Sequence, residues 1–128
     1  MTAHPAPLDV VRAYLEAWTN HDIPTAAGYL ADDLVFDGPI THADSADAFV
    51  NGPGGLTSFA STVVPGSLRL IAAFGDDQQA LVMYEMTTSL LGTVPSAEHF
   101  TVRDGKIRTE RLVFDASEVR RLRPSSGE

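Results

Sequence analysis

Apolar residues recur at helical spacing in the first half of the chain and at strand spacing in the second half. Pro7 suits the first turn of a helix, and five large side chains follow it every three or four positions: Leu8, Val11, Tyr14, Leu15 and Trp18. This pattern predicts a helix that ends near Asn20. Asp22 is expected to cap a second, short helix over residues 23–30.

The middle of the chain is broken into short pieces by glycine and proline. In order, we expect a turn, a short strand, a loop and a third helix: residues 31–33, 34–37, 40–44, and a helix that begins near Asp44 or Ser45. The sequence NGPGG at 51–55 interrupts this helix, because glycine and proline are the worst residues for a helix interior. Helical spacing resumes over residues 56–63, and the interruption is interpreted as a lid or a kink.

The second half is predicted to consist of antiparallel strands. Two long strands are expected over residues 67–74 and 79–91, and a turn over 92–95 leads into a hairpin over 97–115. A short helix is expected to follow as far as Leu122. Helices collected first and strands last favour a single α+β domain over residues 1–128, with disordered ends at 1–6 and 123–128. The sheet is expected to be strongly curved, mostly antiparallel and wrapped around the N-terminal helices, which leaves an apolar cavity for a ligand.

The hairpin turns at Asp104-Gly105, the dipeptide that suits a two-residue type I′ turn. Continued without a break, this register places Arg103 opposite Lys106 and His99 opposite Glu110. One face then carries Ala97, His99, Thr101, Arg108, Glu110, Leu112 and Phe114. The other carries Phe100, Val102, Ile107, Thr109, Arg111 and Val113. Both faces mix apolar and polar residues, so the pattern alone does not decide which one faces inward.

Composition limits the possible partners and chemistry. The chain has 17 acidic and 9 basic residues, a net charge of −8, which argues against nucleic acid or an anionic membrane as a partner. It has no cysteine, so disulfides, thiolate metal sites and a cysteine nucleophile are excluded. No apolar run is long enough to span a membrane, and no signal pattern opens the chain, so a cytoplasmic location is expected.

Two stretches resemble a known superfamily: YLEAWTNHDIPTAAGYLADDLVFDGP at 14–39 and AEHFTVRDGKIRTERLVFD at 97–115. Together with the order of elements, they are similar to the cone-shaped α+β barrels. These include ketosteroid isomerase, SnoaL-like polyketide cyclases, limonene-epoxide hydrolase and nuclear transport factor two. The closest likeness is to SnoaL-like domains. The resemblance implies a cone-shaped barrel, but the fold hosts enzymes and binding modules alike.

The resemblance to ketosteroid isomerase implies roles for three residues. Tyr14 lies eight positions before Asp22, as the oxyanion-binding tyrosine of that enzyme lies before its corner aspartate. His99, five positions before Asp104, stands where that enzyme has a protonated aspartate. The general base of ketosteroid isomerase aligns with Gly38, one residue from Asp37. The steroid isomerase reaction itself is therefore not expected.

Each of these residues also has a purely structural interpretation. Tyr14 could donate a hydrogen bond to a developing enolate or could be an ordinary core tyrosine. His99 could be a general acid or base oriented by Glu110, or half of an exposed cross-strand pair. Asp37 could act as a base if a bulge at Gly38 turned it inward, or could face solvent on a short strand. The catalytic interpretation requires Tyr14 and His99 to share one cavity, and it fails if His99 faces bulk solvent.

The cavity wall is predicted to be aromatic and apolar. Its candidate substrate-binding residues are Trp18, Phe36, Phe59, Tyr84, Met86 and Phe114, with Phe49 beside them, although such residues are more often plain core. Glu85 and Glu98 are expected to point outward. No His-x-His or His-x-x-x-His spacing supports a metal site, so we expect neither metal nor cofactor. An epoxide-hydrolase site would need a buried Asp–Arg–Asp group, for which Arg69 and Arg108 are the only strand arginines to consider.

Two functions remain open at this point. The first is an isomerase or polyketide-cyclase-type enzyme that binds a small apolar carbonyl compound and moves a proton beside the carbonyl. The second is a non-catalytic ligand-binding or dimerisation module of the same fold. We also expect a homodimer, because the hairpin face with Phe100, Val102, Ile107 and Val113 is too apolar to remain exposed.

Overall fold

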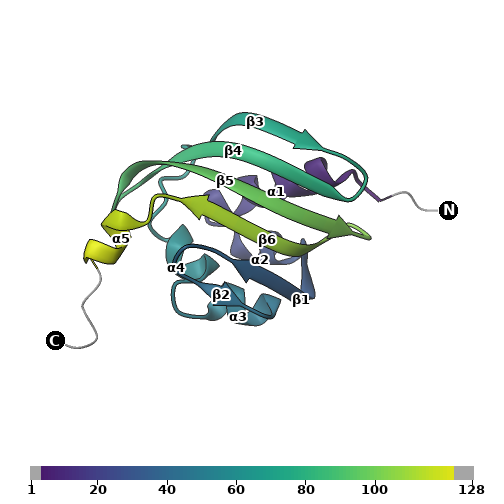
Figure 1. Cartoon of the computed structure of the whole chain (residues 1–128), viewed down its shortest axis with the longest axis horizontal. Coiled ribbons are helices and arrows are strands. Elements are labelled where there is room, and N and C mark those ends of the chain that lie inside the picture. The colour runs from purple at the N-terminus through teal and green to yellow at the C-terminus, as the bar shows by residue number, and fades with distance from the viewer. Residues whose placement is uncertain (1–3, 123–128) are drawn as a thin grey trace.

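A curved, six-stranded sheet wraps around the N-terminal helix in the computed structural model, which describes residues 4–122 (Figure 1). The helices are α1 (Pro7–Thr19), α2 (Ile23–Ala27), α3 (Ala46–Asn51), α4 (Leu56–Ala60) and α5 (Ser117–Leu122). The strands are β1 (Leu30–Asp37), β2 (His42–Ala43), β3 (Arg69–Gly75), β4 (Gln79–Thr88), β5 (Gly92–Arg103) and β6 (Lys106–Phe114). The predicted α+β class is confirmed.

The strands are arranged in the order β2-β1-β6-β5-β4-β3. Only β1 and β6 run parallel, and every other neighbouring pair is antiparallel. The sheet is open at β2 and β3, so it curves into a cone without closing into a barrel. Its concave face packs on α1, and α3 and α4 lie near β1 and β2 (Figure 1). The core therefore lies between the sheet and these helices.

Local sequence signals explain the helix ends. Pro7 occupies the first turn of α1, as predicted. The Asp22 side chain accepts a hydrogen bond from the Thr25 amide at 3.3 Å, and Ser45 accepts one from the Ala48 amide at 3.1 Å. Both predicted caps are therefore confirmed, Ser45 rather than Asp44 in the case of α3.

Several predicted boundaries are wrong. Helix α2 ends at Ala27 and β1 begins at Leu30, because the backbone predicted as a turn joins β6 through an irregular parallel pairing. A two-residue strand, β2, forms in the predicted loop, and α4 ends at Ala60. Strand β5 begins at Gly92, so Pro95 lies inside a strand. Pro95 is tolerated because pairing with β6 begins only at Ser96, and a proline lacks the amide that such pairing needs.

The tip of the β5–β6 hairpin has the predicted turn, but the register beyond it differs. Asp104 and Gly105 have φ of 55° and 75°, as a type I′ turn requires. Val102 pairs with Ile107, whereas Thr101 pairs with Thr109, so Arg108 is an extra residue that forms a β-bulge. Beyond the bulge, every β6 side chain points to the face opposite the one that the unbroken register predicts.

The predicted disordered ends are only partly described. Residues 1–3 and 123–128 lie outside the described part of the chain, and residues 4–6 form neither helix nor strand.

Candidate functional site

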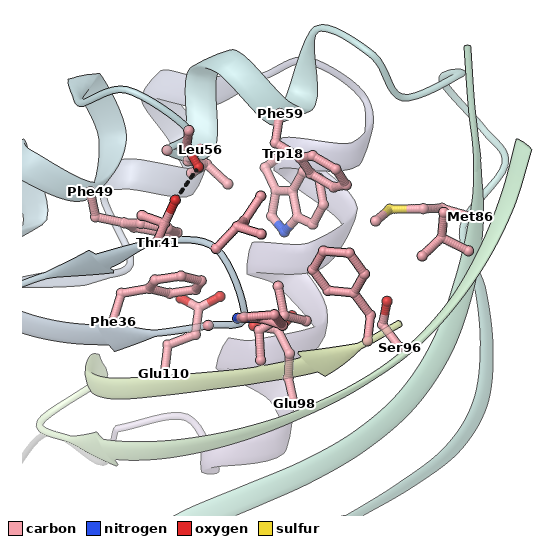
Figure 2. Close-up of a pocket in the computed structure, with 18 of the residues that line it drawn as sticks. Trp18, Phe36, Thr41, Phe49, Leu56, Phe59, Met86, Ser96, Glu98 and Glu110 are labelled. Carbon is pink, nitrogen blue, oxygen red and sulfur yellow. Dashed lines mark hydrogen bonds between the residues drawn. The ribbon is translucent and has the colours of Figure 1, made fainter. Parts of the chain in front are cut away.

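An apolar pocket lies between the concave face of the sheet and helices α1, α3 and α4 (Figure 2). It contains about 570 Å³ of atom-free space, part of which is open to solvent. All six predicted wall residues line it: Trp18, Phe36, Phe59, Tyr84, Met86 and Phe114. Their placement agrees with the sequence analysis, and their contact with a ligand stays a prediction.

The glycine-rich segment between α3 and α4 forms part of the wall. Gly54 and Gly55 line the pocket, and Gly54 has a φ of +71°. A Cβ atom at Gly55 would lie 2.0 Å from the Phe49 carbonyl oxygen, so only glycine permits this close turn. The Thr41 hydroxyl donates to the Gly54 carbonyl at 3.1 Å and so joins the segment to the loop after β1 (Figure 2).

Two carboxyl groups enter the pocket from the β5–β6 hairpin. Glu98 and Glu110 have exposed fractions of only 2% and 3%, and both line the pocket. Glu98 pairs with Leu112 and Glu110 with Phe100, so the two glutamates are diagonal neighbours on the inner face. They share that face only because the bulge at Arg108 shifts β6 by one residue.

Each glutamate accepts a hydrogen bond from a buried tyrosine. The Tyr84 hydroxyl donates to Glu98 Oε1 at 2.6 Å. The Tyr14 hydroxyl donates to Glu110 at 3.0 Å from Oε1 and 3.2 Å from Oε2. Tyr14 is fully buried on α1 and does not line the pocket, so it holds Glu110 from behind. Both tyrosine hydroxyls are thus engaged with protein carboxyl groups.

Burial raises the pKa of both carboxyl groups. The pKa of Glu110 lies well above its ordinary value because of burial first and then the adjacent charge of Glu98. Burial also raises the pKa of Glu98, against the opposing effects of its interactions with Glu110 and Tyr84. Two neighbouring carboxylates cannot both ionise cheaply, so Glu110, whose pKa is raised well above its ordinary value, is expected to hold its proton more firmly than Glu98. Burial, followed by the nearby carboxylates, also raises the pKa of Tyr14 and Tyr84, so both stay protonated.

Two buried polar atoms at the pocket have no hydrogen-bond partner among the described residues. They are Trp18 Nε1, a donor, and Glu98 Oε2, an acceptor. The indole nitrogen lies on the side of the Trp18 ring that faces the strands carrying the glutamates (Figure 2). Buried polar groups are normally paired. These two atoms therefore indicate a site for a ligand that accepts a hydrogen bond from Trp18 Nε1 and interacts with Glu98 Oε2.

Three sequence-based assignments are corrected by this geometry. His99 lies on the outer face, opposite Arg111, with its Nε2 at 2.8 Å from Gln79 Oε1, so Glu110 does not orient it. By the criterion stated above, the catalytic interpretation that rests on Tyr14 and His99 fails. Asp37 also points outward: more than half of its side chain is exposed, and His42 Nδ1 lies 3.7 Å away. Glu98, predicted to be on the surface, is in the pocket.

A signal for Glu98 is present in the sequence. Val94, Phe100 and Val102 share its parity along β5, and they mark the inner face. On β6 the apolar positions change parity between Ile107 and Leu112, and this change is the trace of the bulge. Sequence analysis missed both because it carried an unbroken register outward from the turn.

Other kinds of site receive no support from the described residues. Within residues 4–122, no group of three or more His, Asp or Glu side chains is placed to hold a metal ion. No arginine lines the pocket, so the Asp–Arg–Asp group of an epoxide hydrolase is not assembled there. In the described part of the chain, no helix is long and apolar enough to cross a membrane.

Comparison with known proteins gives the family context. Residues 11–110 match the family model of the SnoaL-like domain. A protein from Kribbella flavida DSM 17836 is 36% identical, with a TM-score of 0.82 over 91% of this chain and 92% of that chain. No curated protein sequence matches this chain.

Two more distant structures show the same fold. An LEH-like epoxide hydrolase from M. tuberculosis is 21% identical, with a TM-score of 0.71 over 90% of this chain and 86% of that chain. A ketosteroid isomerase-like protein from Catenulispora acidiphila DSM 44928, solved in complex with trimethylamine, is 15% identical, with a TM-score of 0.72 over 90% of this chain and 91% of that chain.

Proposed function

The chain belongs to the SnoaL-like domain family, and we propose that its pocket binds a small, largely apolar carbonyl compound and moves a proton on the carbon beside the carbonyl. The reaction would be of the isomerase or cyclase type. The Catenulispora protein with bound trimethylamine supports the view that a domain of this fold can hold a small ligand.

The chemistry divides between two residues of the wall. The ionised Glu98 takes a proton from the carbon beside the carbonyl through its unpaired Oε2. The negative charge that develops on the carbonyl oxygen accepts a hydrogen bond from Trp18 Nε1. With a β,γ-unsaturated ketone, the product of proton removal is a dienolate, and return of the proton from Glu98 to its γ-carbon completes an isomerisation. In a cyclase, the enolate carbon attacks a second carbonyl of the same molecule, and the alkoxide that forms takes up the proton from Glu98. No cofactor is needed for either step.

Glu110, Tyr14 and Tyr84 have supporting roles in this proposal. The proton on Glu110 keeps the pair at a single negative charge, so Glu98 is the member free to act as base. The hydroxyls of Tyr14 and Tyr84 hold the two carboxyl groups in place. This differs from the assignment suggested by the sequence, in which Tyr14 is the oxyanion donor and His99 the base.

The observation that carries the proposal is the presence of two unpaired, buried polar atoms of opposite kind at one pocket. Isotope exchange tests it without knowledge of the natural substrate. A panel of small cyclic and aromatic ketones is incubated with the protein in deuterium oxide, and proton NMR follows loss of the signal beside the carbonyl. We expect exchange above the buffer rate with the wild type.

Three variants assign the roles. Glu98→Gln should slow the exchange by about a hundredfold or more, the usual contribution of a general base. Trp18→Phe should reduce it by a similar factor if the indole stabilises the enolate. Glu85→Gln removes a carboxylate from the outer side of β4 and should have no effect. Ketone binding without any exchange in the wild type would reject catalysis and favour the binding-module alternative.

We also infer a homodimer, on a different surface from the one predicted from the sequence. Phe100, Val102 and Ile107 belong to the core, so the face proposed earlier is not available. The outer face of the sheet instead exposes apolar side chains on adjacent strands: Ile71, Phe74, Leu81, Met83 and Val113. Apolar patches of this kind are usually covered by a partner.

Sedimentation measures this directly. The wild type should sediment as a dimer at micromolar concentration, and Met83→Glu, in the middle of the patch, should shift it to monomer without unfolding it. Thr109→Glu adds the same charge to β6 on the same outer face, away from the patch, and should remain dimeric. A monomeric wild type would contradict the inference.

A further inference from the structure

The pocket holds two buried carboxyl groups, Glu98 and Glu110, beside which the described residues place no positive charge. No Lys, Arg or His among the described side chains lines it. The groups that face the carboxyl pair are the hydroxyls of Tyr14 from α1 and Tyr84 from β4, which donate hydrogen bonds but bring no positive charge. Buried charges are normally paired with an opposite charge, because removing a carboxylate from water is costly.

The rest of the wall is suited to an organic cation. Phe36 and Phe49 stack with ring centroids 4.2 Å apart, and Trp18 and Phe59 meet at 6.0 Å. All four rings line the pocket, as do Tyr84 and Phe114. The faces of aromatic rings carry partial negative charge and attract ammonium groups, most strongly where water is excluded. A buried carboxylate among such rings is complementary to a compact positive charge.

We propose that the ligand of this pocket carries an alkylated ammonium group, which lies against the aromatic wall within the field of the Glu98–Glu110 pair. Combined with the proposed function, the substrate class becomes a small carbonyl compound with a quaternary ammonium group. A fully alkylated ammonium group has no hydrogen to donate, so it neutralises the charge of Glu98 without occupying the Oε2 atom that acts as base. A substrate with its own carboxylate or phosphate would bring a second negative charge into the pocket and be rejected.

A matched pair of ketones tests the inference. Acetonyltrimethylammonium and methyl neopentyl ketone have nearly the same shape, and they differ in having a charged nitrogen or a neutral carbon at one position. Binding is measured by calorimetry and by the fluorescence of Trp18, the only tryptophan of the chain, which lies in the pocket wall. The wild type should bind the cation at least about tenfold more tightly than the neutral ketone. Equal or weaker binding of the cation, or binding of neither compound, would overturn the proposal.

The carboxyl pair should be the source of this preference. In Glu98→Gln/Glu110→Gln the cation should lose its advantage, whereas Glu85→Gln, which neutralises a carboxylate outside the pocket, should keep it. Lowering the pH gives a second measurement on the wild type, in case the double variant does not fold. Protonation of the pair should reduce the preference for the cation, while Tyr14 and Tyr84 stay neutral throughout. A preference that persists in the double variant and at low pH would refute the role of the pair.

The inference shares its site with the proposed function, but the two can fail separately. Cation preference without isotope exchange would keep the ligand class and reject the catalytic role. Isotope exchange without cation preference would keep the catalytic role and reject the ligand class.

Discussion

The two faces of the β5–β6 hairpin carry adjacent residues of the sequence into opposite environments. On the inner face, Glu98 and Glu110 are buried, bonded to tyrosines and raised in pKa. On the outer face, His99 meets Gln79, and Thr101 shares a 2.6 Å hydrogen bond with Thr109 near solvent. A histidine is the more obvious acid–base candidate by type. Its neighbour Glu98 is buried in the pocket with a raised pKa, which is the environment that an acid–base group needs.

This difference shows that burial, more than residue type, determines which titratable group can serve the site. A carboxyl group in water is fully ionised at neutral pH and is a weak base. In the pocket, burial raises the pKa of Glu98 above its ordinary value, against the opposing effects of Glu110 and Tyr84. Arg108 is a single extra residue in β6, and beyond it each β6 side chain lies on the face opposite to the one that an unbroken register would give. The position of Glu110 in the site therefore depends on the bulge.

Inserting one alanine between Thr109 and Glu110 should break the difference between the faces most severely. With Thr101 still opposite Thr109, the insertion would move Glu110, Leu112 and Phe114 outward and bring Arg111 and Val113 inward. We expect a loss of more than about 4 kcal/mol in the free energy of unfolding, measured by urea denaturation followed by circular dichroism. Arg108→Ala keeps the register and removes only a partly exposed ion pair with Asp33, so it should cost about 0.5 kcal/mol or less. Equal stability of the two variants would show that the register of β6 does not decide the stability of the inner face.

Truncating one large apolar side chain on each face should give the next largest contrast. Phe100 is fully buried and packs edge-to-face with Tyr14, so Phe100→Ala should cost about 3–5 kcal/mol. Val113 is 60% exposed in the single chain, and Val113→Ala should change stability by about 0.5 kcal/mol or less. Urea denaturation at several protein concentrations gives both values. A larger, concentration-dependent cost at Val113 would instead support the dimer proposed for that face.

The smallest expected effect is a change in the pH dependence of stability, and it is the effect most specific for the Glu98–Glu110 pair. Burial raises the folded-state pKa of Glu98 and Glu110 above the unfolded value of about 4.3. Between that value and the raised pKa values, the folded protein holds more protons than the unfolded chain, so stability should fall as pH rises. Thermal unfolding from acid to neutral pH should show this decline in the wild type and in the outer-face variant Glu85→Gln. The decline should be reduced in Glu98→Gln/Glu110→Gln, and an unchanged slope there would disprove the assignment.

Much of the framework could be predicted from local signals in the sequence. Pro7 and the spacing after it located α1, Asp22 and Ser45 capped their helices, and Asp104-Gly105 formed the expected turn. The aromatic wall was also predictable, because in a curved sheet wrapped on a helix the same large apolar residues serve as core and as pocket lining. Each of these features depends on interactions over only a few residues or on simple burial.

The polar part of the site could not be predicted in the same way. Tyr14 was identified as a candidate, but its partner is Glu110, 96 residues away, and no local pattern reveals that contact. His99 and Asp37 were favoured for their residue types and spacing, and both lie on the outer surface. Glu98 was taken as a surface residue because it flanks a position that was expected to face the pocket, and neighbouring side chains of a strand alternate between faces.

The sequence by itself determined the α+β class, the helix ends, the hairpin turn and the aromatic character of the pocket, because short-range geometry and hydrophobic burial decide them. Only the tertiary structure decided which face of the hairpin is inside, since one extra residue in β6 reverses every side chain beyond it. It also decided the environment of the polar residues: two glutamates became a buried pair with raised pKa values when the sheet, α1 and the helices over the pocket removed them from water.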